Sequence, residues 1–132
     1  MVILDSLNGY VNAMPDERFL IVQLHELLTY LGQAGVATLL VGAHHGLIGG
    51  QMQTPVDASY LADAIVLLRY FEAEGEVRQA ISVVKKRGGA HERTIRPLTL
   101  SDTGISIGEP LRHYRGILTG VPVPVGDLTA SG

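Results

Sequence analysis

Val36-Ala37-Thr38-Leu39-Leu40-Val41 is an apolar run that decides the fold of this chain. It is shorter than a typical helix, so it predicts a central strand covered on both faces. Upstream, leucines at spacings of three and four predict an amphipathic helix from about Asp16 to Gly32. The first apolar run, residues 2–4, predicts a buried strand that ends at Asp5. Strand, helix and strand make a βαβ unit, whose two strands should be parallel.

The second half of the chain is typical of an antiparallel sheet. Residues 65–71 and 77–84 are strand-like runs separated by an acidic loop that contains Gly75, which predicts a hairpin. Residues 94–100 and 105–107 predict a further pair of strands around a turn. The predicted fold class is therefore α/β with a mixed sheet, parallel strands first and antiparallel strands after.

The C-terminal residues lack this periodicity. After Gly108 the pattern ends, and prolines alternate with valines before a small polar ending. We therefore expect residues 111–132 to form an extended, poorly packed tail or linker.

Composition limits the classes of function. At 132 residues the chain has the length of one domain, and its formal net charge of -3 argues against binding nucleic acid through overall charge. It contains no cysteine, which excludes disulfides and thiolate metal sites and makes a reducing cytoplasm the simplest location. No apolar run approaches the roughly 18 residues that a membrane span needs, so we expect no membrane partner.

Several well-known catalytic motifs are missing from the sequence. It has no Gly-x-Ser-x-Gly turn, no Gly-x-Gly-x-x-Gly after its first strand and no Gly-x-x-x-x-Gly-Lys-Ser/Thr phosphate loop. An apolar strand that ends in Asp5 instead matches the part of a nucleoside-triphosphatase site that presents an acid toward magnesium.

Positive charge is densest at residues 85–87, which read Lys85-Lys86-Arg87 and are followed by two glycines and His91. Cations at a strand end, with flexible backbone beyond them, suit an anion such as a phosphate. A solvated strand end is the alternative interpretation.

His44 and His45 follow the second strand, at the edge where α/β sheets collect ligands. Adjacent histidines point to different sides of an extended backbone, which makes them poor partners for one metal. We therefore prefer to interpret both histidines as polar loop residues.

Four segments together resemble the KaiC-like circadian-clock ATPase family of the RecA/DnaB group. They are Ile3-Leu4-Asp5-Ser6-Leu7-Asn8, Tyr60-Leu61-Ala62-Asp63, Val84-Lys85-Lys86-Arg87-Gly88 with His91, and Pro97-Leu98-Thr99-Leu100-Ser101-Asp102-Thr103-Gly104-Ile105. The resemblance covers nearly the whole chain in the right order, but only the C-terminal half of the family's domain. It implies a truncated RecA-like three-layer fold, with residues 1–110 forming the part that starts at the Walker B strand.

The resemblance also implies roles for individual residues. Asp5 matches the Walker B aspartate, which holds magnesium through its water shell. Lys85 and Arg87 match the Lys-x-Arg finger that reaches across a subunit interface to the γ-phosphate of a neighbour's ATP. The other implied residues are Lys86, Gly89 and His91 in the same nucleotide-contacting loop, Ser101 and Asp102 near the neighbour's nucleoside, and His44 as a sensor of the γ-phosphate.

Two functional hypotheses follow. In the first, the chain is an ATP-binding part of a KaiC-like ATPase that uses ATP and Mg²⁺ in a homo-oligomeric ring. The P-loop and the catalytic carboxylates lie upstream of residue 1 in this comparison, so the chain alone should not hydrolyse ATP. In the second, the chain is a non-catalytic assembly module whose cations dock an acidic partner or a nucleic-acid phosphate, an outcome that is not favoured.

Overall fold

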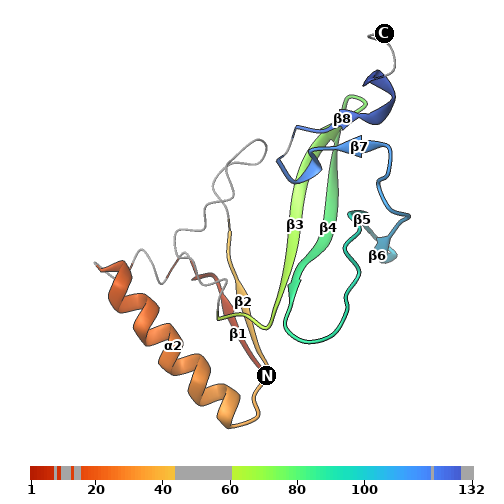
Figure 1. The fold of residues 1–132 in the computed structure, drawn as a ribbon. Coiled ribbons are helices and arrows are strands. Elements are labelled where there is room, and N and C mark those ends of the chain that lie inside the picture. Colours follow the sequence, from red (N-terminus) through yellow and green to blue (C-terminus); the bar gives the residue numbers. More distant parts are fainter. Residues whose placement is uncertain (8, 10–12, 14–15, 44–60, 120, 129–132) are drawn as a thin grey trace. The chain divides into compact units, whose positions relative to one another are not determined.

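The computed structural model describes residues 1–7, 9, 13, 16–43, 61–119 and 121–128 (Figure 1). These residues form two compact units. The first contains the described residues up to 43 together with Leu61 and Ala62, and the second contains those from Asp63 onward. Each unit has a hydrophobic core of its own.

The first unit is a βαβ arrangement. Strand β1 (Val2–Asp5) pairs in parallel with β2 (Thr38–Val41), and helix α2 (Glu17–Gln33) connects them. The Asp16 side chain caps the helix by accepting a 2.9 Å hydrogen bond from the Arg18 amide. The predicted parallel pair is therefore confirmed.

No helix among the described residues is long and apolar enough to cross a membrane.

The core of the first unit lies on one face of this small sheet. Leu7, Leu20 and Leu24 are buried, and Leu40 of β2 packs against them. Side chains alternate along a strand, so Leu39 lies on the other face, where it is 53% exposed. The expectation that residues 36–41 are covered on both faces is thus wrong in this structure, because packing from α2 reaches only one face.

The second unit is a four-stranded antiparallel sheet. Its strands, in spatial order, are β3 (Ala64–Ala73), β4 (Glu76–Lys86), β5 (Arg96–Ser101) and β6 (Gly104–Ile107). Glu74 and Gly75 join β3 to β4 with φ of 55° and 75°, a left-handed pair that suits the twist of a tight hairpin. The predicted hairpin and the order of parallel before antiparallel strands are confirmed.

One face of this sheet is covered by residues that follow β6. Phe71 and Ala80 are buried on that face together with Ile117, which is only 1% exposed. Ile117 begins a short 3-10 helix, η1 (Ile117–Thr119), and β7 (Tyr114–Arg115) pairs with β8 (Val123–Pro124) before η2 (Val125–Leu128). The expectation of poor packing is therefore wrong at Ile117, while the assignment of residues 111–132 to a tail outside the ATPase domain stays a prediction.

The opposite face of the sheet is apolar and open to solvent. It carries one stripe of residues from β3 and a second from β5 and β6, which the strand register places on the same side. Each of the following side chains is more than half exposed: Val66, Leu68, Leu100, Ile105 and Ile107.

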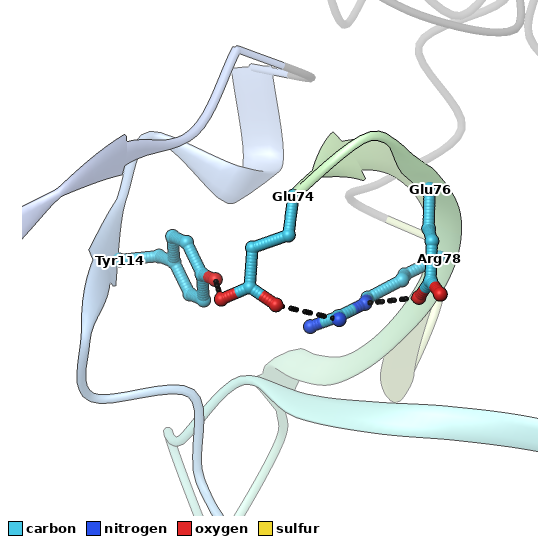
Figure 2. Close-up of polar contacts among 4 residues, drawn as sticks. All are labelled: Glu74, Glu76, Arg78 and Tyr114. Carbon is cyan, nitrogen blue, oxygen red and sulfur yellow. Dashed lines mark hydrogen bonds and ion pairs between the residues drawn. The ribbon is translucent and has the colours of Figure 1, made fainter.

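A polar network joins the hairpin to β7 (Figure 2). The Tyr114 hydroxyl donates to Glu74 Oε1 at 2.8 Å, and Arg78 Nη2 donates to Glu74 Oε2 at 2.9 Å. Arg78 Nε also donates to Glu76 Oε2 at 3.2 Å. The hydrogen bond from Tyr114, followed by the contacts with Arg78, lowers the pKa of Glu74, and the same bond to Glu74 raises the pKa of Tyr114.

A cavity of about 650 Å³ lies beside this network. Its lining comes from the end of β3 and from the segment around β7 and β8, and includes Glu72, His113, Pro122 and Pro124. The hairpin and the segment after residue 112 therefore line an open pocket together as well as sharing a core.

The buried ring of Phe71 should be a main source of stability in the second unit. Replacing a fully buried Phe by Ala leaves a cavity, so Phe71→Ala should lower the free energy of unfolding by about 3–5 kcal/mol. Leu68→Ala is the matched control on the same strand, since Leu68 is 63% exposed and its truncation should cost about 0.5 kcal/mol or less. Urea unfolding measures both, and equal losses would contradict this assignment of the core.

The hydrogen bond from Tyr114 should be visible in the titration of Glu74. Tyr114→Phe removes the main cause of the lowered pKa, so the carboxylate pKa should move up toward its ordinary value of 4.5. NMR of the side-chain carboxyl carbon measures this shift. Tyr70→Phe, on the other face of β3, is the control and should leave it unchanged.

The same variant makes a prediction about pH and stability. A lowered folded-state pKa stabilises the fold above the unfolded value and loses that contribution as pH falls through the folded value. The stability difference between the wild type and Tyr114→Phe should thus be present above about pH 4.5 and shrink in acid. A difference that grows on acidification would contradict the role of this bond.

Candidate functional site

The cationic segment lies at the end of β4, where strand pairing is irregular. Ile65 lies opposite Lys85, but Val66 lies opposite Val83, so Val84 is an extra residue on β4. Such a β-bulge changes the face on which the following side chains lie. Directly opposed residues share a face of the sheet, so Lys85 lies on the face of Ile65, which is also the face of Phe71. Without the bulge it would lie on the open apolar face.

Arg87 follows two residues later and should therefore lie on the same side as Lys85. Its backbone amide donates to the Asp63 carbonyl at 2.6 Å, which continues the pairing of β3 with β4 by one residue. Its Nη1 atom also lies 3.1 Å from Asp63 Oδ1. Both side chains are largely exposed, at 60% for Arg87 and 82% for Asp63. In the structure this backbone bond and ion pair place the guanidinium beside Asp63.

The backbone changes direction immediately after Arg87. Gly88 and Gly89 have φ of 79° and 77°, a left-handed conformation that residues with a Cβ atom adopt only with strain. Both are exposed, and His91 just beyond them is half-buried. Lys86 lies opposite Ala64, so its side chain points to the other face from Lys85. The structure thus divides the three cations between two faces of the sheet.

Ser101 and Asp102 lie elsewhere on the same sheet. They form the turn between β5 and β6, where Ser101 Oγ lies 2.8 Å from Thr103 Oγ1 and 3.2 Å from Gly104 O. Strand β5 pairs with residues 79–81 of β4 and runs antiparallel to it, toward the turn that joins β3 to β4. The turn therefore lies away from Lys85, and one chain does not bring these residues together with the finger.

Asp5 is exposed at the carboxyl end of β1, opposite Val41, and belongs to the first unit. Among the described residues no three His, Asp or Glu side chains are grouped so that they could hold a metal ion. Magnesium usually keeps several waters and takes one or two carboxylates plus substrate phosphates, so a single aspartate at a strand end fits that requirement. His44, the candidate sensor, lies outside the described residues.

Sequence patterns gave no reason to assign roles to Val84 or Asp63. Val84 is one more apolar residue in a β-branched run, and only the pairing with β3 shows that it is extra. Asp63 precedes a strand, as many turn residues do. Its contact with Arg87 arises because the end of β4 lies beside the start of β3.

Comparison with known proteins identifies relatives of the chain. The family model described as "ATPase: KaiC" matches residues 1–112. The circadian clock protein KaiC3 of Synechocystis sp. is 37% identical over 97 residues, which are 74% of this chain and 19% of that protein. The circadian clock oscillator protein KaiC of Synechococcus elongatus is 32% identical over 96 residues, 73% of this chain and 18% of that protein.

The chain spans about a fifth of the length of these two relatives. The family model nevertheless matches well over half of this chain, and it does so across both structural units. Parallel strands followed by an antiparallel sheet agree with the resemblance in the four segments. The chain therefore belongs to the KaiC ATPase family.

Proposed function

We propose that this chain supplies two sets of groups to ATP sites between subunits of a KaiC-type ATPase. Asp5 acts as the Walker B aspartate of its own subunit, and Lys85 and Arg87 act as a finger toward the nucleotide of a neighbour. The observation that supports this most strongly is the bulge at Val84, which moves Lys85 off the open apolar face and onto the face of Ile65, where Arg87 should also lie.

The finger fits the chemistry of phosphoryl transfer. Negative charge develops on the phosphate oxygens, and fixed positive charge placed there lowers the barrier, even when it comes from another chain. The Arg87 guanidinium is always charged and its planar fork matches a phosphate, whereas Lys85 supplies a compact point charge. Magnesium, when bound, neutralises phosphate charge, and Asp5 would hold part of its water shell.

The remaining site residues extend the same proposal. Lys86, Gly89 and His91 would contact nucleotide from the loop that follows the finger. Ser101 and Asp102 would approach the neighbour's nucleoside from their own turn, and His44 would sense the γ-phosphate. The assembly that makes such contacts between chains is a homo-oligomeric ring in the cytoplasm. Within each subunit, residues 1–110 would form the C-terminal part of a RecA-like three-layer domain.

Turnover should need more than this chain. Its sequence has no phosphate loop, so isolated chains should bind nucleotide weakly and should not hydrolyse it. A finger that acts on a neighbour's nucleotide accounts for the cluster of cations at residues 85–87, although this sequence has no phosphate loop of its own.

The finger can be tested in a longer protein. Residues 1–112 replace the matching segment of Synechocystis KaiC3, and ATP turnover of the chimera is measured with and without Arg87→Ala. We expect kcat to fall about tenfold or more, since arginine fingers contribute about 10³–10⁵-fold elsewhere. Arg93→Ala removes an exposed cation from the following loop and is the matched control, which should retain turnover. Unchanged turnover in Arg87→Ala would refute the finger role.

The alternative, a polyanion-binding module, rests on the exposure of Lys86 and Arg87. A salt titration separates the two functions. Simple polyanion contact weakens steeply with salt and shows no preference for a nucleoside, whereas the proposed site should prefer ATP with magnesium over inorganic polyphosphate of equal charge.

A further inference from the structure

We infer that Asp63 is a positioning residue for Arg87, holding its guanidinium where a neighbouring nucleotide can meet it. This inference rests on the proposed function of Arg87 as a finger. It concerns a residue that immediately precedes β3, opposite Arg87, and that would act on the nucleotide only through Arg87.

Asp63 contacts Arg87 at both the backbone and the side chain. The 2.6 Å bond from the Arg87 amide fixes the backbone, and the 3.1 Å contact between Nη1 and Oδ1 fixes the guanidinium. Asp63 itself immediately precedes β3, whose pairing with β4 extends over its whole length.

The positions on either side of Arg87 explain why such an anchor is needed. The bulge at Val84 interrupts the regular ladder before it, and Gly88 and Gly89, the residues with the greatest backbone freedom, follow it. Arg87 is thus the last side chain before a flexible joint. Asp63 ties it to β3, the strand that also carries Phe71 into the core.

The ion pair is better suited to orientation than to stability. Exposed pairs of this kind contribute at most about 1 kcal/mol, and these side chains are 60% and 82% exposed. A guanidinium has five N–H donors in a fixed plane, so a contact through Nη1 to a carboxylate oxygen restrains the orientation of that plane. A planar donor group with a restrained orientation loses less freedom when it binds phosphate.

Coulomb repulsion alone and a positioning role predict opposite effects of removing the Asp63 charge on nucleotide binding, so the direction of the change distinguishes them. Asp63 carries a negative charge close to the proposed phosphate position, so removing it should strengthen anion binding if Coulomb repulsion is all that matters. If Asp63 positions Arg87, removing its charge should weaken binding despite the lost repulsion. The nearby Lys85 and Lys86 are unchanged in both cases.

The experiment titrates Mg·ATP into the KaiC3 chimera, because the proposed site needs a phosphate loop that this chain lacks, and follows the NMR signals of residues 85–91 and of Arg87 Nε–Hε. We expect Asp63→Asn to weaken binding about threefold, within what one exposed pair can contribute, and to narrow the Arg87 side-chain signal toward that of a freely rotating group. Asp63→Glu should restore part of the affinity. Glu109→Gln removes the same charge from an exposed position of this unit and is the control, which should bind as tightly as the wild type or slightly more tightly.

A double-mutant cycle keeps the inference testable if Asp63→Asn also disturbs the hairpin. In the Arg87→Lys background the planar fork is gone, so Asp63→Asn should no longer weaken binding; an equal loss in both backgrounds would mean that Asp63 acts on the strand and not on Arg87. Tighter or unchanged binding by Asp63→Asn would overturn the inference. A chimera with the wild-type segment whose signals at residues 85–91 do not respond to Mg·ATP would instead overturn the proposed function.

Discussion

The antiparallel pairing of β3 with β4 is the constraint on which the second unit depends. It fixes which side chains face the core, because opposed residues share a face and neighbours along a strand alternate. Phe71 is carried inward by this register, and the single extra residue Val84 then changes the face of everything that follows on β4. One irregularity thus moves Lys85 from the open face to the face of Phe71, and Lys86 to the open face.

The same hairpin determines how the C-terminal segment packs. Ile117 lies beyond the residues that the family model matches, yet it is buried against Phe71 and Ala80. The ring of Tyr114 lies with its centre 6.5 Å from that of Phe71, and its hydroxyl reaches Glu74 in the hairpin turn. Apolar burial provides the larger part of the attachment, since Ile117 is almost fully buried whereas the hydrogen bond from Tyr114 to Glu74 is exposed to solvent.

The proposed site is distributed, and this explains its composition. The proposed nucleotide site would be incomplete on a single chain, because Asp5 ends β1 and the cations of residues 85–87 lie at a separate strand end. In the proposed arrangement, positive charge delivered from a neighbour would couple catalysis to assembly, because the finger would act only when the interface is formed. The contact between Asp63 and Arg87 fits this logic, since a finger that waits for a partner's nucleotide needs an anchor on its own chain.

The sequence by itself determined the local elements: the leucine spacing of α2, the βαβ order, the hairpin at Gly75 and the cluster of cations at residues 85–87. These depend on side-chain periodicity and turn chemistry, which are local properties. Only the tertiary structure decided that Val84 is extra, that Asp63 holds Arg87, that Ile117 is buried and that residues 36–41 are covered on one face. The physical reason is common to all four: strand register and burial are set by the partner that lies opposite, and the partner's position is not written in the spacing of a segment's own residues.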